Sequence, residues 1–222
     1  MSAGPVPRWP GAAGPVLALA ALACVHVTAA GSVDPVNGLI SEYALLDGSA
    51  WAMTCGMIAL AMGSVWVAYL LSRLDPARGA AARVLFLAAA LGLLLAAAFP
   101  TDTEAAVTSV GGEIHRWSAA VVFTALPCAG WMVARRSGNR TLAGVAVASV
   151  MLLAAFLAAH PGSPASDLVG DPGYHGLFQR LLVLADITLV LLAARRVGEK
   201  GGHPVTGALV PRPSGSGASA RV

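Results

Sequence analysis

The chain has 222 residues, of which 57% are hydrophobic and 11% charged, and its mean hydropathy is +0.73. This balance excludes an ordinary soluble domain and is typical of a polytopic membrane protein. The formal net charge of +3 comes from basic residues spread over short loops rather than along one stripe, so we expect no nucleic-acid partner.

Six apolar runs, each about long enough to cross a bilayer as a helix, follow one another along the chain. They are rich in Ala, Leu and Val and lack the alternation that is typical of transmembrane β-strands. The runs cover residues 14–31, 51–71, 83–99, 117–134, 141–160 and 176–194. We predict an all-α fold, a six-helix transmembrane bundle over 14–196, with disordered Gly/Pro/Ser-rich segments at 1–13 and 197–222.

The first run has two interpretations. Arg8 precedes it and the small-residue stretch TAAGS follows it, as in a cleavable signal peptide. His26 inside the run and an even number of helices, which keeps the basic tail inside, favour a retained helix. Cleavage would leave the topology of the other helices unchanged.

Basic residues are divided unequally among the loops. The N-terminus, residues 72–83, residues 135–140 and the tail hold 12 of the 14 Lys and Arg residues, and the other two are Arg116 and Arg180. By the positive-inside rule both termini are cytoplasmic, in a multi-pass protein of the cell membrane. The loops after the first, third and fifth helices then face outward, and they carry eight of the eleven acidic residues.

The segment between the first two helices, residues 34–51, is too long for a tight turn and too apolar for a plain loop. We predict a short amphipathic helix at the membrane interface, with the apolar residues Leu39, Ile40, Tyr43 and Leu46 on one face. This helix would place Ser41 and Glu42 at the outer mouth of the bundle.

Small residues at helical spacing predict close helix contacts. Gly56, Ala59 and Gly63 lie on one side of the second helix, and Gly144 and Ala148 are four residues apart in the fifth. The three cysteines lie in predicted helices without a C-x-x-C pair, so we interpret them as small apolar side chains rather than as a disulfide framework.

Histidines also gather at the outer boundary, since His115, His160 and His175 fall at the start of the fourth helix, the end of the fifth and the start of the sixth. Three histidines and a water form a catalytic zinc shell, but spacings of 45 and 15 residues match no local metal motif. We therefore predict no metal site and no cofactor. The plainer interpretation of this outer rim is that any exposed loop of a membrane protein is polar.

The sixth helix carries a polar stripe towards the middle of the membrane. His175, Gln179, Leu182 and Asp186 lie within about 40° of one another around the helix axis. Asp186 lies roughly 16 Å below His175, and an ionisable group at that depth costs at least about 2.5 kcal/mol. Asp186 is therefore either a functional group facing the bundle interior or an interhelical hydrogen-bonding group.

Two further residues belong to this region. His26, near the outer end of the first helix, can share the interior with Asp186. Arg180, in the first turn of the sixth helix, can extend to lipid headgroups or pair with an outer acid such as Asp102 or Glu42.

Four short segments carry a resemblance to a known family: ISEYAL (40–45), FPTD (99–102), GEIH (112–115) and GLFQR (176–180). Through them the chain resembles domain of unknown function 998, a prokaryotic integral-membrane family common in actinobacteria, over roughly residues 14–196. A more distant likeness to autophagy-modulator and GPI-lipid-remodelling membrane proteins implies an association with lipids by analogy. The resemblance implies signature positions but no catalytic mechanism.

Three functional hypotheses remain open. The first is a binding protein whose outward-facing polar cavity takes a lipid headgroup or small ligand. The second is a membrane-embedded hydrolase or lipid-modifying enzyme, although no G-x-S-x-G, phosphate-binding loop or H-E-x-x-H motif is present in the sequence. The third is a proton-coupled transporter, which the lack of inverted repeats disfavours. Candidate outer-face residues are Ser41, Glu42, Asp102, His115, His160, His175, Gln179 and Arg180, and candidate intramembrane residues are His26 and Asp186.

Overall fold

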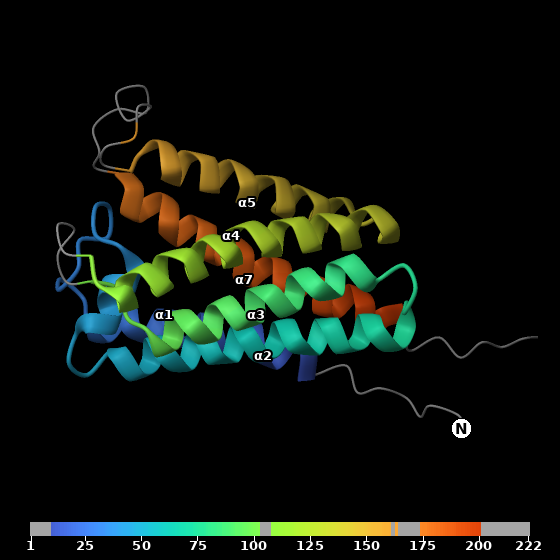
Figure 1. Cartoon of the computed structure of the whole chain (residues 1–222), viewed down its shortest axis with the longest axis horizontal. Coiled ribbons are helices and arrows are strands. Elements are labelled where there is room, and N and C mark those ends of the chain that lie inside the picture. The colour runs from blue at the N-terminus through green and yellow to red at the C-terminus, as the bar shows by residue number, and fades with distance from the viewer. Residues whose placement is uncertain (1–9, 103–107, 161–162, 164–173, 201–222) are drawn as a thin grey trace, which may run out of the picture.

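The computed structural model describes residues 10–102, 108–160, 163 and 174–200. In this part of the chain, six helices are long and apolar enough to cross a membrane, which confirms the predicted all-α, six-helix fold. A short 3₁₀-helix, η1, separates the first two (Figure 1). The elements are α1 Pro10–Thr28, η1 Ile40–Leu45, α2 Ala50–Leu74, α3 Ala80–Ala98, α4 Val110–Ser137, α5 Arg140–Ala158 and α7 His175–Lys200.

Several helices extend beyond the apolar runs that predict them. α4 begins at Val110 because the Ser109 side chain caps its first turn, so the polar residues 110–116 are helical rather than part of a loop. Residues 10–13, predicted to belong to a disordered N-terminal segment, form the first turn of α1, and α7 continues to Lys200. The remaining residues of the two predicted tails lie outside the described part.

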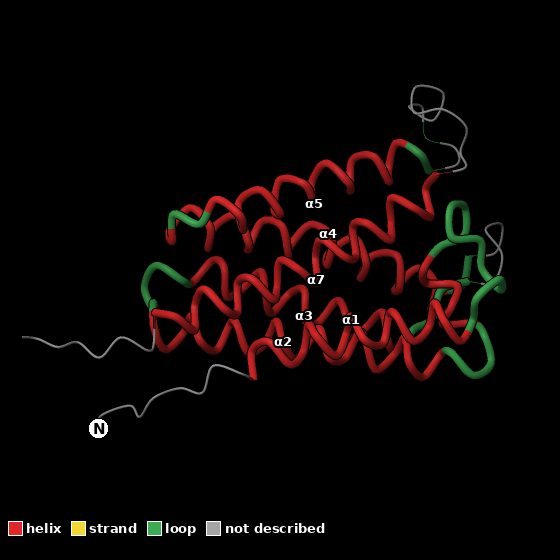
Figure 2. The backbone as a smooth tube through the Cα atoms, turned by 180° about the vertical axis from the view of Figure 1, so that it is seen from behind, coloured by secondary structure: helices red, strands yellow, loops and turns green. Residues whose placement is uncertain are grey.

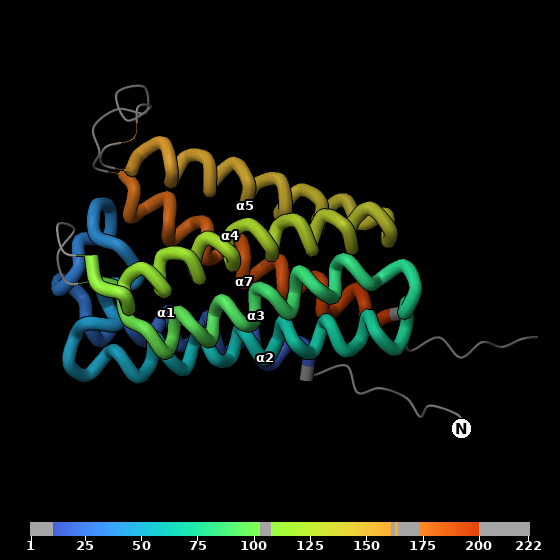
Figure 3. Tube along the Cα trace, in the orientation of Figure 1, coloured from blue at the N-terminus to red at the C-terminus, as the bar shows by residue number. Residues whose placement is uncertain are grey.

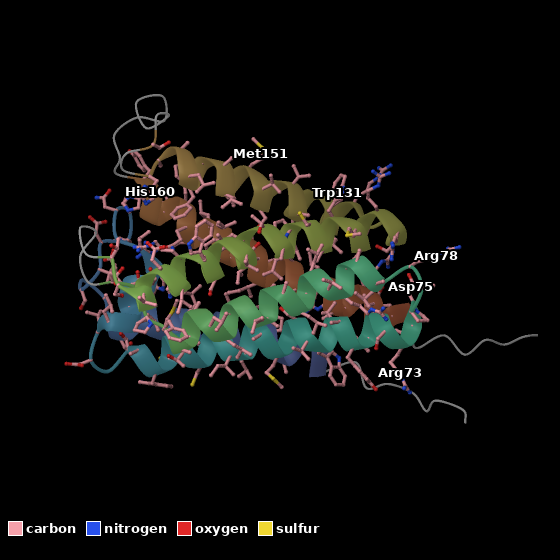
Figure 4. All side chains as sticks on the ribbon, in the orientation of Figure 1. Arg73, Asp75, Arg78, Trp131, Met151 and His160 are labelled. Atoms are coloured by element: carbon pink, nitrogen blue, oxygen red, sulfur yellow. The ribbon has the colours of Figure 1, made fainter. Side chains whose placement is uncertain are left out.

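The two ends of the bundle differ (Figures 1 and 2). At one end, here called the η1 end, lie η1, the loop 29–49, and residues 99–102 and 108–109. At the other, here called the turn end, short turns at 75–79 and 138–139 connect α2 to α3 and α4 to α5, and α7 ends there. The labelled Arg73 and Arg78 lie at the turn end and His160 lies at the η1 end (Figure 4).

α7 is the helix around which the others are arranged (Figure 3). It packs against α1, α2, α4 and α5, whereas α5 lies on the flank of the bundle and packs against α4 and α7. Leu182, Leu189, Val190 and Ala193 of α7 are completely buried. A polar side chain on the inner face of α7 is therefore held within the bundle.

The predicted small-residue contact in α2 is confirmed. A Cβ atom built on Gly63 would lie 2.8 Å from Cδ of Pro15, and one on Gly14 would lie 2.5 Å from the carbonyl oxygen of Ala59, so α1 and α2 pack backbone against backbone. Gly144 and Ala148 of α5 are exposed, so the second predicted pair makes no such contact in the described fold.

The η1 segment packs into the bundle rather than lying flat at the membrane interface as predicted. Ile40 and Tyr43 form a small apolar cluster with Val25 of α1, with Ala29 just after this helix, and with Ala52 of α2. The amphipathic pattern was recognised correctly, but its apolar face is buried by the ends of α1 and α2 instead of by lipid. η1 consequently covers the adjacent ends of α1 and α2.

Candidate functional site

The η1 segment is tied to the start of α7 by backbone and amide hydrogen bonds. The Ile40 amide donates to Oε1 of Gln179 at 2.6 Å, and the Leu177 amide donates to the Val36 carbonyl at 2.9 Å. A Cβ atom on Gly176 would collide with the carbonyl oxygen of Gly38, so only glycine permits this approach. We call this set of contacts the η1 clasp.

Arg180 completes the η1 clasp and is only 7% exposed. Its Nη1 donates to the carbonyl oxygens of Gly38 at 2.6 Å and Gly176 at 3.1 Å. Its Nε donates to Nε2 of His26 at 3.2 Å, and the guanidinium lies 5.8 Å from the centre of the Tyr43 ring. The charge of Arg180 thus faces oxygen lone pairs, an imidazole nitrogen and an aromatic face, while its Nη2 has no hydrogen-bond partner among the described residues.

The arrangement fixes the state of His26. Its Nδ1 lies 2.8 Å from the Leu22 carbonyl, which only accepts, so Nδ1 carries the hydrogen. Nε2 must then be unprotonated to accept from Arg180. His26 is therefore the neutral Nδ1–H tautomer, and it also contacts the Tyr43 ring at a centroid distance of 5.1 Å.

The suggested pairing of Arg180 with Asp102 or Glu42 is not what the structure shows. Oε1 of Glu42 instead accepts from the Leu39 amide at 2.9 Å, which closes the first turn of η1. Asp102 pairs with Arg116 at 3.3 Å on the other side of the site. The reason is that the backbone of the η1 segment, rather than an acidic side chain, fills the space beside Arg180.

A second clasp joins the end of α3 to the start of α4, and it involves the FPTD and GEIH segments. Oδ1 of Asp102 accepts from the Ser109 hydroxyl at 2.5 Å, and that hydroxyl accepts from the Gly112 amide at 2.9 Å. The Asp102 carboxylate occupies the space that a Cβ atom on Gly112 would take. We call these contacts the α4 clasp.

His115 belongs to the α4 clasp and is buried. Its Nδ1 lies 2.9 Å from the carbonyl oxygen of Phe99 and 3.2 Å from that of Ala96, at the end of α3. Because both partners only accept, Nδ1 carries the hydrogen. Nε2 of the neutral ring is then a hydrogen-bond acceptor.

Two loop carboxylates at the η1 end have lowered pKa values. The Ser109 hydroxyl, followed by the Ser109 amide and Arg116, lowers the pKa of Asp102 against the opposing effect of burial. Backbone hydrogen bonds from Val36 and Asn37 lower the pKa of Asp34, with a smaller contribution from the charge of Arg180. Both carboxylates are therefore ionised near neutral pH.

A cavity of about 100 Å³ has residues of both clasps in its wall. Ser41 and Gln179 come from the η1 clasp and His115 comes from the α4 clasp, while Asp186 lies deeper. The remaining lining is apolar and comes from α1, α2, α3, α4 and α7, for example Met53, Met57 and Ala119. The sequence predicted a polar cavity, whereas most of this wall is apolar because many outer-face side chains bond to backbone groups instead.

Asp186 has both of the features that the sequence left as alternatives. The Ser149 hydroxyl of α5 donates to its Oδ1, which is an interhelical hydrogen bond. Asp186 also lines the cavity at a residue exposure of 1%, and its Oδ2 has no hydrogen-bond partner within the described residues. Gln179, Leu182 and Asp186 are all buried, as the predicted stripe requires.

The three outer histidines do not form one cluster. His160 is exposed beyond the end of α5, and His175 begins α7 without lining the cavity, although both have interaction partners. Over the described ranges, no group of three or more His, Cys, Asp or Glu side chains is arranged to hold a metal ion. Of the ten candidate residues, four line the cavity, namely Ser41, His115, Gln179 and Asp186.

Sequence reasoning missed two functional neighbours. Tyr43 was assigned only to an apolar face, yet its ring contacts both His26 and Arg180. Ser149 was not considered, although a hydroxyl in the middle of an apolar helix was a signal for a buried hydrogen bond. Tyr43 lies in η1 and Ser149 lies in α5, and the residues that each contacts depend on how these elements pack in the bundle.

The fold and its site define a polytopic helical membrane protein with six apolar spans. The chain belongs to the family described as protein of unknown function (DUF998), which it matches over residues 12–196. Neither a curated protein nor a solved structure matches the chain.

Proposed function

We propose that this protein binds an amphipathic ligand, in the first instance a membrane lipid, in the cavity between the two clasps. The observation that carries the proposal is the composition of the cavity wall. Apolar residues of five helices enclose most of it, and a few polar side chains converge at the η1 end. This combination is typical of ligand sites, in which apolar walls supply affinity and a few polar groups fix orientation.

The polar groups near η1 suit a ligand head that both donates and accepts hydrogen bonds. His115 offers Nε2 as an acceptor, because its Nδ1 hydrogen is used by α3. Gln179 offers its amide NH₂ as a donor, because its oxygen is used by Ile40. A hydroxyl or glycerol group matches this pair, with the Ser41 hydroxyl beside it.

The volume limits how much of a ligand enters. An apolar cavity of about 150 Å³ holds a molecule the size of benzene, so about 100 Å³ accommodates a short apolar group rather than a whole acyl chain. The ligand inserts one small apolar portion and leaves the rest at the mouth. By the positive-inside argument, this mouth faces the outside of the cell.

The test is native mass spectrometry of the protein purified in a mild detergent, followed by organic extraction of what remains bound. Ala119 lines the cavity, and its neighbour Ala120 is exposed on α4. We expect the wild type and Ala120→Phe to retain an amphipathic species that Ala119→Phe loses. Ala119→Leu, a smaller replacement, should reduce occupancy while the protein stays folded. Equal retention by folded Ala119→Phe and Ala120→Phe would refute the proposal.

A further inference from the structure

At the deep end of the cavity lies the carboxyl group of Asp186, and only one of its two oxygens has a hydrogen-bond partner among the described residues. One oxygen of Asp186 accepts from Ser149, while the other lies at the cavity wall with no hydrogen-bond partner among the residues that the structure describes. A buried polar atom without a partner is costly, so such an atom at a cavity is a place where a ligand gains affinity.

The surroundings determine the form of this carboxyl group. From α5 it meets a neutral hydroxyl, that of Ser149. Arg180 is six residues earlier on α7, roughly 9 Å along the axis, and its donor contacts are made to Gly38, Gly176 and His26 rather than to Asp186. His115 lines the same cavity with its Nδ1 directed to carbonyls at the end of α3, and His26 accepts from Arg180.

No described cation therefore contacts Asp186, and an isolated carboxylate in such a position carries a penalty of several kcal/mol. The neutral acid avoids that penalty. A carboxylic acid has one oxygen that accepts and one that carries the hydrogen. Since the Ser149 hydroxyl donates to Oδ1, the hydrogen belongs on Oδ2, which faces the cavity.

We propose that Asp186 is a neutral carboxylic acid whose Oδ2–H donates to an uncharged acceptor oxygen at the inner end of the ligand. This proposal rests on the proposed function and specifies the ligand group that Asp186 binds: an ester, ketone or amide carbonyl carried on a small apolar group. A cationic or carboxylate group at that end is disfavoured, because neither finds an opposite charge there.

The state of Asp186 is tested directly by infrared spectroscopy of the purified protein at neutral pH. The wild type should show the C=O stretching band of a buried carboxylic acid, and the band should disappear in Asp186→Asn. The loop carboxylates Asp34 and Asp102 have lowered pKa values and contribute no such band. Absence of the band in the wild type would overturn the proposal while leaving ligand binding itself untouched.

The donor role is tested with two small probes of nearly equal shape, cyclobutanone and methylenecyclobutane, in which a C=O group replaces a C=CH₂ group. Their binding in detergent is followed by ligand-detected NMR, with Ala119→Phe defining non-specific partition into micelles. We expect the wild type to prefer the ketone about tenfold, which corresponds to about 1.4 kcal/mol for one hydrogen bond. Asp186→Asn keeps an NH₂ donor and should keep the preference, whereas Asp186→Leu should lose it.

The outcomes separate the two proposals. Equal binding of both probes to the wild type and to Asp186→Leu would refute the donor role but leave the cavity as a ligand site. Binding of neither probe above the Ala119→Phe background would contradict the proposed function, whatever the infrared band shows. If the ketone is preferred, nanodiscs of diester and diether phosphatidylcholine identify its source. Greater stabilisation by the diester assigns the acceptor to a lipid carbonyl, and equal stabilisation assigns it to a smaller molecule.

Discussion

The η1 end and the turn end of the bundle are held together by different kinds of contact. At the η1 end, polar contacts join residues that are far apart in sequence, such as Arg180 with the Gly38 carbonyl, 142 residues away. At the turn end, local contacts close the helix connections: Gly138 adopts a left-handed conformation at φ 66°, and the Asn139 side chain caps α5. Long-range polar contacts there, such as Arg136 with Asp75, are partly exposed. The conformation of the turn end is thus determined mainly by residues close in sequence. The conformation of the η1 end depends on how the helices pack.

The η1 end also contains a buried arginine, whereas the ion pairs of the turn end are partly exposed. Arg136 pairs with Asp75 at 3.6 Å and Arg196 with Glu199 at 2.8 Å, with all four side chains at least a third exposed. Exposed pairs of this kind contribute little to stability. Arg180, by contrast, is buried against carbonyls. A polar residue at the η1 end is therefore the better candidate for a structural or ligand-binding role.

The sharpest difference between the ends should be their side of the membrane. In a cysteine-free background, Asp47→Cys in the exposed loop of the η1 end should react completely with an impermeant thiol reagent on intact cells, and Ser137→Cys at the turn end should not. Permeabilised cells provide the control, in which both should react. Labelling of position 137 with protection of position 47 on intact cells would reverse the orientation.

Glycine substitutions test the close approach of Gly176 to the Gly38 carbonyl at the η1 end. Gly176→Ala places a Cβ atom against the Gly38 carbonyl and should destabilise the protein by about 1–3 kcal/mol. Gly144→Ala is the matched control, because a Cβ atom there meets nothing within 4 Å, and it should change stability by no more than about 1 kcal/mol. Thermal unfolding in detergent measures both. Equal effects would show that the η1 clasp is not closely packed.

Helix caps allow a finer comparison of the two ends. The Ser109 side chain accepts from Gly112 at 2.9 Å and that of Asn139 accepts from Leu142 at 3.0 Å, so each alanine substitution removes one cap worth about 1 kcal/mol. Ser109→Ala also releases Asp102, and we expect it to cost more than Asn139→Ala, by about 1 kcal/mol. A larger loss in Asn139→Ala would contradict the α4 clasp.

The smallest expected effect is the change with pH in the stability that the Asp102 carboxylate contributes. The pKa of Asp102 is lowered in the folded state, so its carboxylate stabilises the protein above the unfolded value of 3.8, and this stabilisation is lost as the pH falls through the folded pKa. Asp102→Asn should therefore melt below the wild type at neutral pH, and the difference should shrink below about pH 4. The test is to measure the melting temperatures of both proteins across this pH range. If the difference between them does not change with pH, the loss of stability in Asp102→Asn is due to packing alone.

Much of the fold was predictable, because it depends on local patterns. Apolar runs located all six helices, and the spacing of Gly56, Ala59 and Gly63 predicted the closely packed face of α2, although not that α1 is its partner. Helix ends were less predictable where polar residues continue a helix, as in the first turn of α4. The burial of η1 was not predictable, since an amphipathic pattern is satisfied equally by lipid and by helix ends.

The site was predictable only in part. Helical periodicity placed Gln179 and Asp186 on one stripe, because both belong to α7. Their partners come from other elements: Ile40 is 139 residues from Gln179 and Ser149 is 37 residues from Asp186. Which helices face each other cannot be deduced from spacing along one of them, and for the same reason Arg180 was paired with the wrong groups.

Photolabelling tests the central claim, ligand binding at the η1 end, most directly. The protein is reconstituted in phosphatidylcholine–phosphatidylglycerol vesicles that contain a trace of a diazirine-bearing phospholipid, and labelled peptides are mapped after irradiation. The claim predicts labelling around Met53 and Met57 of the cavity wall, lost in Ala119→Phe and kept in Ala120→Phe, besides general labelling of lipid-facing residues such as Met62 and Met151. Labelling confined to the lipid-facing residues and unchanged by Ala119→Phe would contradict it.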